Sequence, residues 1–238
     1  MKRSILPRLS LALIVLVAGI SAGVLHTVRA GEFEDGVAAY ENDEYEEAAR
    51  AFGIAADKGN ADAQFNLGLM YLKGEGVGQD YAKAFDLFSK SAEQNNVRAQ
   101  VNLARMYAKG KGVAPNYKLA VQWFRRAADQ GYADAQYSLG VLYVTGNAVP
   151  LDYKKAQELF QKAADQNNAS AQFQLGLMHF KGKGMPVNLV EAYKWLLIAG
   201  DYDEAVNFRD FAKQKMSDEQ VRQAQDLADD WKPAGSGQ

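Results

Sequence analysis

The stretch 61–77, ADAQFNLGLMYLKGEGV, decides the fold, because the chain repeats its pattern at a fixed interval. At an offset of 36 residues, four units align over 61–96, 97–132, 133–168 and 169–204. In every unit the third residue is alanine, the fourth is glutamine and the seventh is leucine. Self-similarity at such a period is typical of a solenoid, in which small structural units stack on one another.

Each unit is predicted to form two helices joined by a glycine turn. In the first unit Leu67, Met70 and Tyr71 give residues 61–73 an apolar stripe at helical spacing. The segment KGEG at 73–76 ends this helix, because glycine adopts left-handed torsions without steric cost. A second helix follows a residue that can accept hydrogen bonds from the helix start, namely Asp80, Asn116, Asp152 and Asn188 in the four units.

The sequence extends this pattern at both ends. Residues 32–60 are a shortened first unit, because Phe52 stands 36 residues before Phe88 while the turn has lost four residues. Residues 203–215 and 218–231 are two further helices, the second opened by a capping box of Ser217 and Gln220. We therefore expect an all-α solenoid of five helix-turn-helix repeats over 31–200, capping helices over 201–232 and a flexible tail over 233–238.

The first 30 residues differ from the rest in composition. A basic start with Lys2, Arg3 and Arg8 precedes a long apolar run over 9–25, and Val-Arg-Ala at 28–30 fits a signal peptidase site. We expect a cleaved signal peptide that leaves Gly31 first; the alternative is an uncleaved membrane anchor. In both cases the rest of the chain is translocated across the inner membrane, into the periplasm or out of the cell.

Composition excludes several classes of site and partner. The chain has no cysteine, so disulfides and thiolate metal sites are excluded, and no cofactor is expected. Residues 1–30 hold four basic and no acidic residues, so the remaining 23 basic and 29 acidic residues give a formal net charge of −6. Nucleic acid is not an expected partner, because the chain has no basic field that could release counterions.

The motif at 61–77 resembles the Sel-one-like repeat family, a relative of the tetratricopeptide repeats. The resemblance covers 61–200 closely and 32–60 more loosely, with departures at Ala148, His179 and Leu189. It implies a right-handed superhelix of helix pairs and a role as an adaptor in signalling, secretion or cell-envelope assembly. Some members carry paired cysteines and are associated with β-lactam binding, which this cysteine-free chain does not inherit.

By the same resemblance, the first helix of each pair lines a concave surface that holds a protein or peptide. Apolar residues would anchor the partner segment there, and lysines and arginines would pair with its acidic groups. The alternative for the aromatic positions 65, 137 and 173 is packing against neighbouring helices. The expected partner-binding residues are Leu69, Leu72, Lys73, Arg105, Lys109, Tyr137, Val141, Phe173, Leu177, Phe180 and Lys181.

Enzymatic activity is not expected. The one histidine beyond residue 30, His179, stands in a column that is otherwise tyrosine, and no serine or cysteine nucleophile has a base placed for it. The glycines at 74–78 lie between two helices and form the turn of the repeat, not a phosphate loop. Polysaccharide or peptidoglycan binding is the second hypothesis and hydrolysis the third, although Trp123 and Trp195 are expected to pack in the core.

Overall fold

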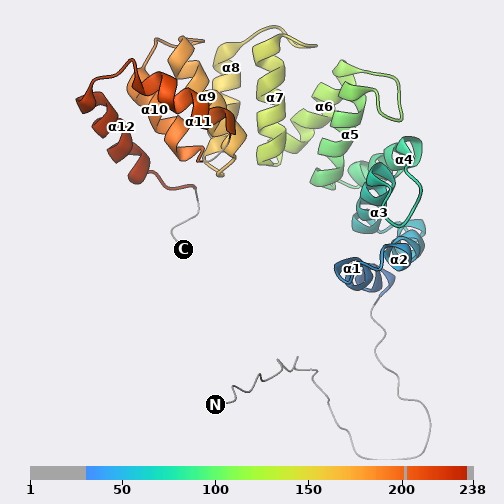
Figure 1. Ribbon diagram of the computed structural model, residues 1–238. Coiled ribbons are helices and arrows are strands. Elements are labelled where there is room, and N and C mark those ends of the chain that lie inside the picture. The colour runs from blue at the N-terminus through green and yellow to red at the C-terminus, as the bar shows by residue number, and fades with distance from the viewer. Residues whose placement is uncertain (1–30, 201–202, 235–238) are drawn as a thin grey trace, which may run out of the picture. The chain divides into compact units, whose positions relative to one another are not determined.

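The computed structural model describes residues 31–200 and 203–234, and within these ranges the chain forms twelve α-helices and no strand. The expected leader at 1–30 lies outside the described residues, as does the end of the expected tail. Figure 1 shows the helices following one another in chain order. Among the described helices none is long and apolar enough to cross a membrane.

Ten of these helices form five pairs. In each pair the two helices pack against each other, and the second helix also packs on the first helix of the next pair. This arrangement confirms the expected all-α solenoid of five helix-turn-helix repeats. The pairs are α1 (Glu32–Glu41) with α2 (Tyr45–Asp57), α3 (Ala61–Lys73) with α4 (Tyr81–Glu93), α5 (Val97–Lys109) with α6 (Tyr117–Asp129), α7 (Ala133–Thr145) with α8 (Tyr153–Ala164), and α9 (Ala169–Lys181) with α10 (Leu189–Ile198).

Side-chain caps fix where most helices begin. The four expected caps of the second helices are confirmed, each accepting a backbone N–H at 2.9–3.1 Å. Asn60, Asn96 and Asn168 cap first helices in the same way, at 2.8–3.0 Å. Each such cap contributes about 1 kcal/mol, so residues close in sequence set where these helices begin.

A small residue lets the two helices of a pair approach each other. A Cβ atom on Gly68 would lie 2.8 Å from the ring of Phe88, and one on Gly36 would lie 2.6 Å from the ring of Phe52. The first pair is therefore built like the others. Its first helix aligns with α3 at an offset of 32 residues, and its second helix aligns with α4 at an offset of 36.

Buried glutamines connect one pair to the next. Gln64, Gln100, Gln136 and Gln172 each donate Nε2 to the backbone carbonyl eight residues earlier, at 3.2–3.4 Å. In the first three, the side-chain oxygen also accepts from a glutamine 30 residues later, at 2.8–2.9 Å. A buried amide costs free energy unless it is hydrogen-bonded, so these contacts select one spacing between pairs and explain the glutamine column.

The turns that contain Gly76, Gly112 and Gly184 dock on the preceding pair. A Cβ atom on Gly112 would collide with the backbone carbonyl of Tyr81, which is why this position needs glycine. Ala148 replaces that glycine one unit later and still adopts a left-handed φ of 63°. Tyr117, which lies 36 residues after Tyr81 and is its counterpart in the pair before Ala148, is 47% exposed at the start of α6. At Ala148 the chain therefore departs from the repeat motif but keeps the backbone conformation of the turn.

The two C-terminal helices pack differently on the last pair. α11 (Asp203–Lys213) packs on both α9 and α10, whereas α12 (Asp218–Asp229) packs on α10. The capping box of Ser217 and Gln220 is confirmed, with hydrogen bonds of 3.0 and 3.3 Å. Beyond α12, Trp231 packs on Trp195 with ring centroids 6.0 Å apart.

Candidate partner-binding site

The groove face is the surface made by the positions of each first helix that correspond to 65, 69, 72 and 73. Leu69, Leu72 and Val141 are half-buried here, and Lys73, Arg105, Lys109 and Lys181 are exposed. Leu69 and Leu72 pack against the core that α3 shares with α4 and α5. The exposed part of this face is therefore a row of aliphatic side chains with cations beside it.

The aromatic residues of this face contribute to the core. Phe65 is buried with its ring centroid 5.9 Å from that of Phe88, and Tyr137 makes the same contact with Phe160 at 5.9 Å. Phe173 is 7% exposed. These contacts agree with the packing alternative for the aromatic positions, since little of Phe65 or Phe173 is available to a partner.

The chain's own helix α11 covers the groove face of the last pair. Phe208 of α11 packs edge-on against Phe173, with centroids 5.8 Å apart, and lies 6.4 Å from Phe180. Phe211 packs on Phe180 at 5.5 Å. Leu177 belongs to the same cluster, and the Nζ atom of Lys181 lies 5.8 Å from the centroid of the Phe208 ring. Four of the expected partner-binding residues are thus engaged within the molecule.

Two of the groove cations already have an acidic neighbour. Arg105 pairs with Asp134 of α7 at 3.4 Å, and Lys73 pairs with Glu75 at 3.3 Å. Burial opposes the charge of Lys73, but hydrogen bonds to Glu75 and Tyr40 outweigh it and raise the pKa of its ammonium group. Lys109 makes no ion pair with any described residue. The expected pairing of these cations with an acidic partner stays a prediction.

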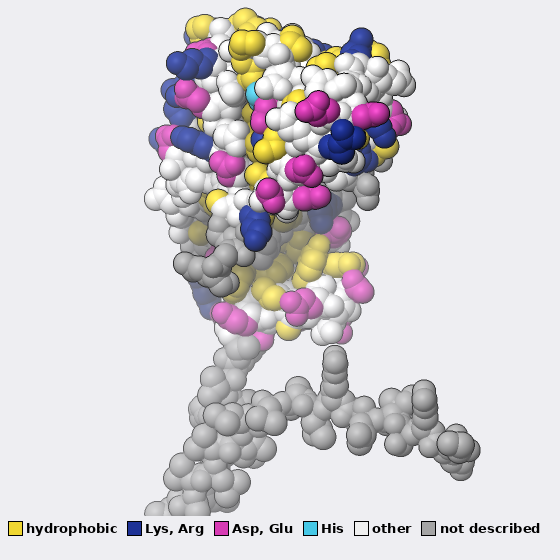
Figure 2. All heavy atoms as spheres, turned by 90° about the vertical axis from the view of Figure 1, so that its left-hand side faces the viewer, with side chains coloured by type: hydrophobic (Ala, Val, Ile, Leu, Met, Phe, Trp, Pro, Cys, Tyr) yellow, Lys and Arg dark blue, Asp and Glu magenta, His cyan; other side chains and the backbone are white. Residues whose placement is uncertain are grey.

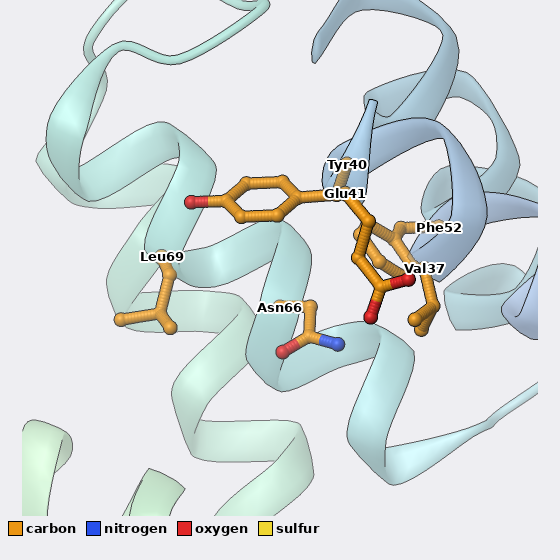
Figure 3. A pocket seen from close by; sticks show the side chains of 6 residues that line it. All are labelled: Val37, Tyr40, Glu41, Phe52, Asn66 and Leu69. Carbon is orange, nitrogen blue, oxygen red and sulfur yellow. The ribbon is translucent and has the colours of Figure 1, made fainter. Parts of the chain in front are cut away.

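An open pocket of about 200 Å³ lies between α1 and α3. Figure 3 shows Tyr40 reaching from α1 toward α3, while the side chains of Glu41 and Asn66 point into the space between the helices. The hydroxyl of Tyr40 donates to Glu75 at 2.8 Å, which holds the ring in this position. The lining residues are Val37, Tyr40, Glu41, Phe52, Asn66 and Leu69.

Of these lining residues, only Leu69 is among those predicted from the sequence. At the 32-residue offset, Val37, Tyr40 and Glu41 correspond to Leu69, Leu72 and Lys73, so they are the groove-face residues of the first pair. An alignment at 36 residues alone misses them, because the shortened turn shifts α1 by four residues.

Charge is concentrated at the same end of the chain. Residues 31–60 hold nine acidic and two basic residues, a net charge of −7, whereas residues 61–238 hold 20 acidic and 21 basic residues, a net charge of +1. The two basic residues, Arg50 and Lys58, are already paired with Glu47 and Glu32. Figure 2, which views the end of the stack that carries α12, shows both signs of charge interspersed.

His179, Trp123 and Trp195 lie on helices of the repeats. No group of three or more His, Asp or Glu side chains among them is placed to hold a metal ion. Burial lowers the pKa of His179, and its Nδ1 atom is buried without a hydrogen-bond partner in the described chain. Trp195 is buried and Trp123 is half-buried beside Arg126, as expected for residues that pack.

A comparison of the sequence with protein families identifies the same repeating units as the helix pairs of the structure. The sequence pattern of the Sel1 repeat matches residues 61–96, 97–132, 133–168 and 169–201. The chain belongs to the Sel1 repeat family. The first helix pair lies outside these matches, and the structure supplies it as a fifth repeat. No curated protein matches the chain.

Several solved structures contain a similar stack of helix pairs. The protective antigen c5321 of uropathogenic Escherichia coli, with an SLR fold, is 32% identical with a TM-score of 0.78, over 83% of this chain and 44% of that chain. This Sel1 chain thus spans less than half of that antigen. A Sel1 repeat protein from Oxalobacter formigenes is 27% identical with a TM-score of 0.74, over 84% of this chain and 83% of that one. The immunity protein PA5088 from Pseudomonas aeruginosa shares the fold, at 19% identity and a TM-score of 0.51 over 87% of both chains.

Proposed function

We propose that this Sel1 repeat protein is a non-catalytic scaffold of the cell envelope, which binds a segment of a partner protein on its groove face. The Sel1 repeat solenoid is a fold typical of protein–protein interaction scaffolds, and Sel1 repeat proteins bind protein partners. One observation carries the assignment to this face: an open pocket with apolar walls lies between α1 and α3, at groove-face positions of two successive repeats.

The exposed part of the groove face supports this proposal. Val37, Leu69 and Leu72 follow one another along the first two pairs and are half-buried, with apolar surface left for a partner. Binding surfaces of this kind use a few apolar anchors inside a polar rim. Beside these anchors, Lys109 has no ion pair with any described residue and is free to contact the partner.

A co-purification experiment tests the partner site. Tagged protein should retain one partner in stoichiometric amount, and Leu69→Glu should reduce capture at least about tenfold, because it places a charge among the apolar anchors. Lys109→Glu, at an exposed site outside the pocket, should change capture less, and Glu93→Lys on the outside of α4 should leave it unchanged. If Leu69→Glu folds normally by circular dichroism and still captures the partner fully, the groove face is not the binding surface.

The envelope location rests on the leader. A basic start, an apolar run over 9–25 and Val-Arg-Ala at 28–30 support export followed by cleavage. Cell fractionation should recover the protein outside the cytoplasm, and N-terminal sequencing should read Gly31 first. A mature chain that begins at Met1 and stays with the membrane would show that the segment is an anchor. Recovery from the cytoplasm would exclude both readings.

A further inference from the structure

We propose that the pocket between α1 and α3 takes one apolar side chain from a partner segment rich in lysine and arginine, and that Glu41 pairs with a cation next to that side chain. This inference rests on the proposed function and narrows it to one end of the groove face and to a basic protein segment.

The pocket suits a single apolar anchor. Val37, the Tyr40 ring and Leu69 provide apolar walls, and Phe52, 2% exposed, lies beneath them. An apolar cavity of about 150 Å³ is large enough for benzene. A pocket of about 200 Å³ therefore has room for one aromatic or branched aliphatic side chain.

The other end of the groove face shows what this surface accepts. On α9, the groove-face residues Phe173 and Phe180 receive Phe208 from α11, at 5.8 and 6.4 Å between ring centroids. A helix that presents an aromatic side chain thus already fits this face within the same molecule. In the first two pairs Phe65, the counterpart of Phe173, is buried against Phe88, whereas Leu69 and Leu72 are half-buried and the pocket beside Leu69 stays open.

The charge around the pocket favours a cation. Glu34, Val37 and Glu41 are spaced by three and four residues, so the two carboxylates lie on the pocket side of α1. Both glutamates are exposed, and neither has an ion pair with a described residue. The nearest cation on α3, Lys73, is already held by Glu75 at 3.3 Å. With a net charge of −7 over residues 31–60, this end attracts a basic segment and repels an acidic one.

Two synthetic peptides test the inference on the purified protein. One is a fluorescein-labelled helical peptide with two phenylalanines three residues apart and lysines around them; the other has glutamates in place of the lysines. Fluorescence anisotropy should show saturable binding of the lysine peptide, at least about tenfold weaker binding of the glutamate peptide, and weakening with added NaCl.

Variants locate the binding. Glu41→Lys should weaken the lysine peptide about tenfold, and Glu41→Gln should weaken it less, because an attractive charge is reversed in one and only removed in the other. Glu41 is exposed at the end of α1, so both variants should fold. The matched charge reversal Glu93→Lys, on α4, should leave binding unchanged.

The outcomes separate this inference from the proposed function. Failure of the lysine peptide to bind, equal binding of both peptides, or binding that Glu41→Lys does not change would overturn the basic-segment assignment alone. A dimer in ultracentrifugation that Glu41→Lys dissociates would assign the pocket to a second copy, and would overturn it too. Full partner capture by a folded Leu69→Glu variant would overturn the proposed function, whatever the peptides do.

Discussion

Equivalent positions of the groove face are open in the second repeat and covered in the fifth. Around α3, Leu69 borders an open pocket. On α9, its counterpart Leu177 lies in a cluster closed by Phe208 of α11. Because the repeat positions are equivalent, the difference comes from α11, the helix that comes after the fifth repeat. Within the described residues, the stack is closed at one end by α11 and keeps apolar surface open near the other.

Uncovering the closed end should have an effect as large as any of those predicted below. Phe208→Ala removes the ring that packs on Phe173 and Phe180, and should cost about 2 kcal/mol, since Phe208 is half-buried and a fully buried phenylalanine costs about 3–5. Hydrogen exchange of α11 should accelerate accordingly. Phe211→Ala is the control: Phe211 is 47% exposed, so the cost should be below about 1 kcal/mol. Equal effects of the two variants would mean that α11 does not close this end through Phe208.

The second prediction compares equivalent positions in the turns of two successive repeats, Gly112 and Ala148. Gly112→Ala should destabilise by about 2 kcal/mol, because its Cβ atom would meet the Tyr81 carbonyl at a left-handed φ of 71°. Ala148→Gly should stabilise by about 1 kcal/mol, because it relieves the same left-handed strain one repeat later. Urea unfolding of both variants measures the difference. Destabilisation by Ala148→Gly would contradict this account of the turns.

The hydrogen bond that holds the Tyr40 ring over the open pocket should have a smaller effect. Tyr40→Phe removes its 2.8 Å hydrogen bond to Glu75 and should cost about 1 kcal/mol in urea unfolding. Glu75→Gln, which keeps an acceptor but removes the charge, should cost less. If Tyr40→Phe has no effect on stability, the hydroxyl does not hold the ring in place.

The smallest expected effect is a pH dependence at His179, where the second, third and fourth repeats have Tyr71, Tyr107 and Tyr143. Burial lowers the pKa of His179, opposed by Glu191, so the folded protein binds fewer protons than the unfolded chain. The stability from neutral His179 is complete above about pH 6.5, the pKa of an unperturbed histidine, and falls as the pH drops below it. Between about pH 7.5 and 5, on either side of that pKa, His179→Tyr should therefore lose less stability than the parent protein. Parallel pH profiles would contradict a buried neutral histidine.

The sequence predicts the repeated part of the fold well because the signals are local. Capping residues such as Asp80 and Asn116 satisfy the helix starts wherever the helices later pack, and the apolar columns specify the core. The packing of α11 on α9 could not be predicted. α11 lies outside the repeat, and its apolar pattern predicts a helix but not the helix it packs against. The pairing of Arg105 with Asp134, 29 residues away, likewise depends on how two repeats stack.

The candidate site was predicted only in part. Leu69 and Leu72 follow from the groove positions of the resemblance, but Val37, Tyr40 and Glu41 require the 32-residue offset, which the 36-residue period hides. The sequence already implies this offset, because the first turn has lost four residues. The structure adds that Gly36 lies against Phe52 as Gly68 lies against Phe88, so the first pair joins the groove face.

Photo-crosslinking in cells from position 69 and from position 177 tests the contrast between the two ends most directly. A photoreactive amino acid in place of Leu69 should yield a covalent adduct with a partner protein. The same amino acid in place of Leu177 should instead react within the chain, with residues of α11. A partner adduct from position 177 and none from position 69 would contradict an open groove face near α1 and a closed one at α9.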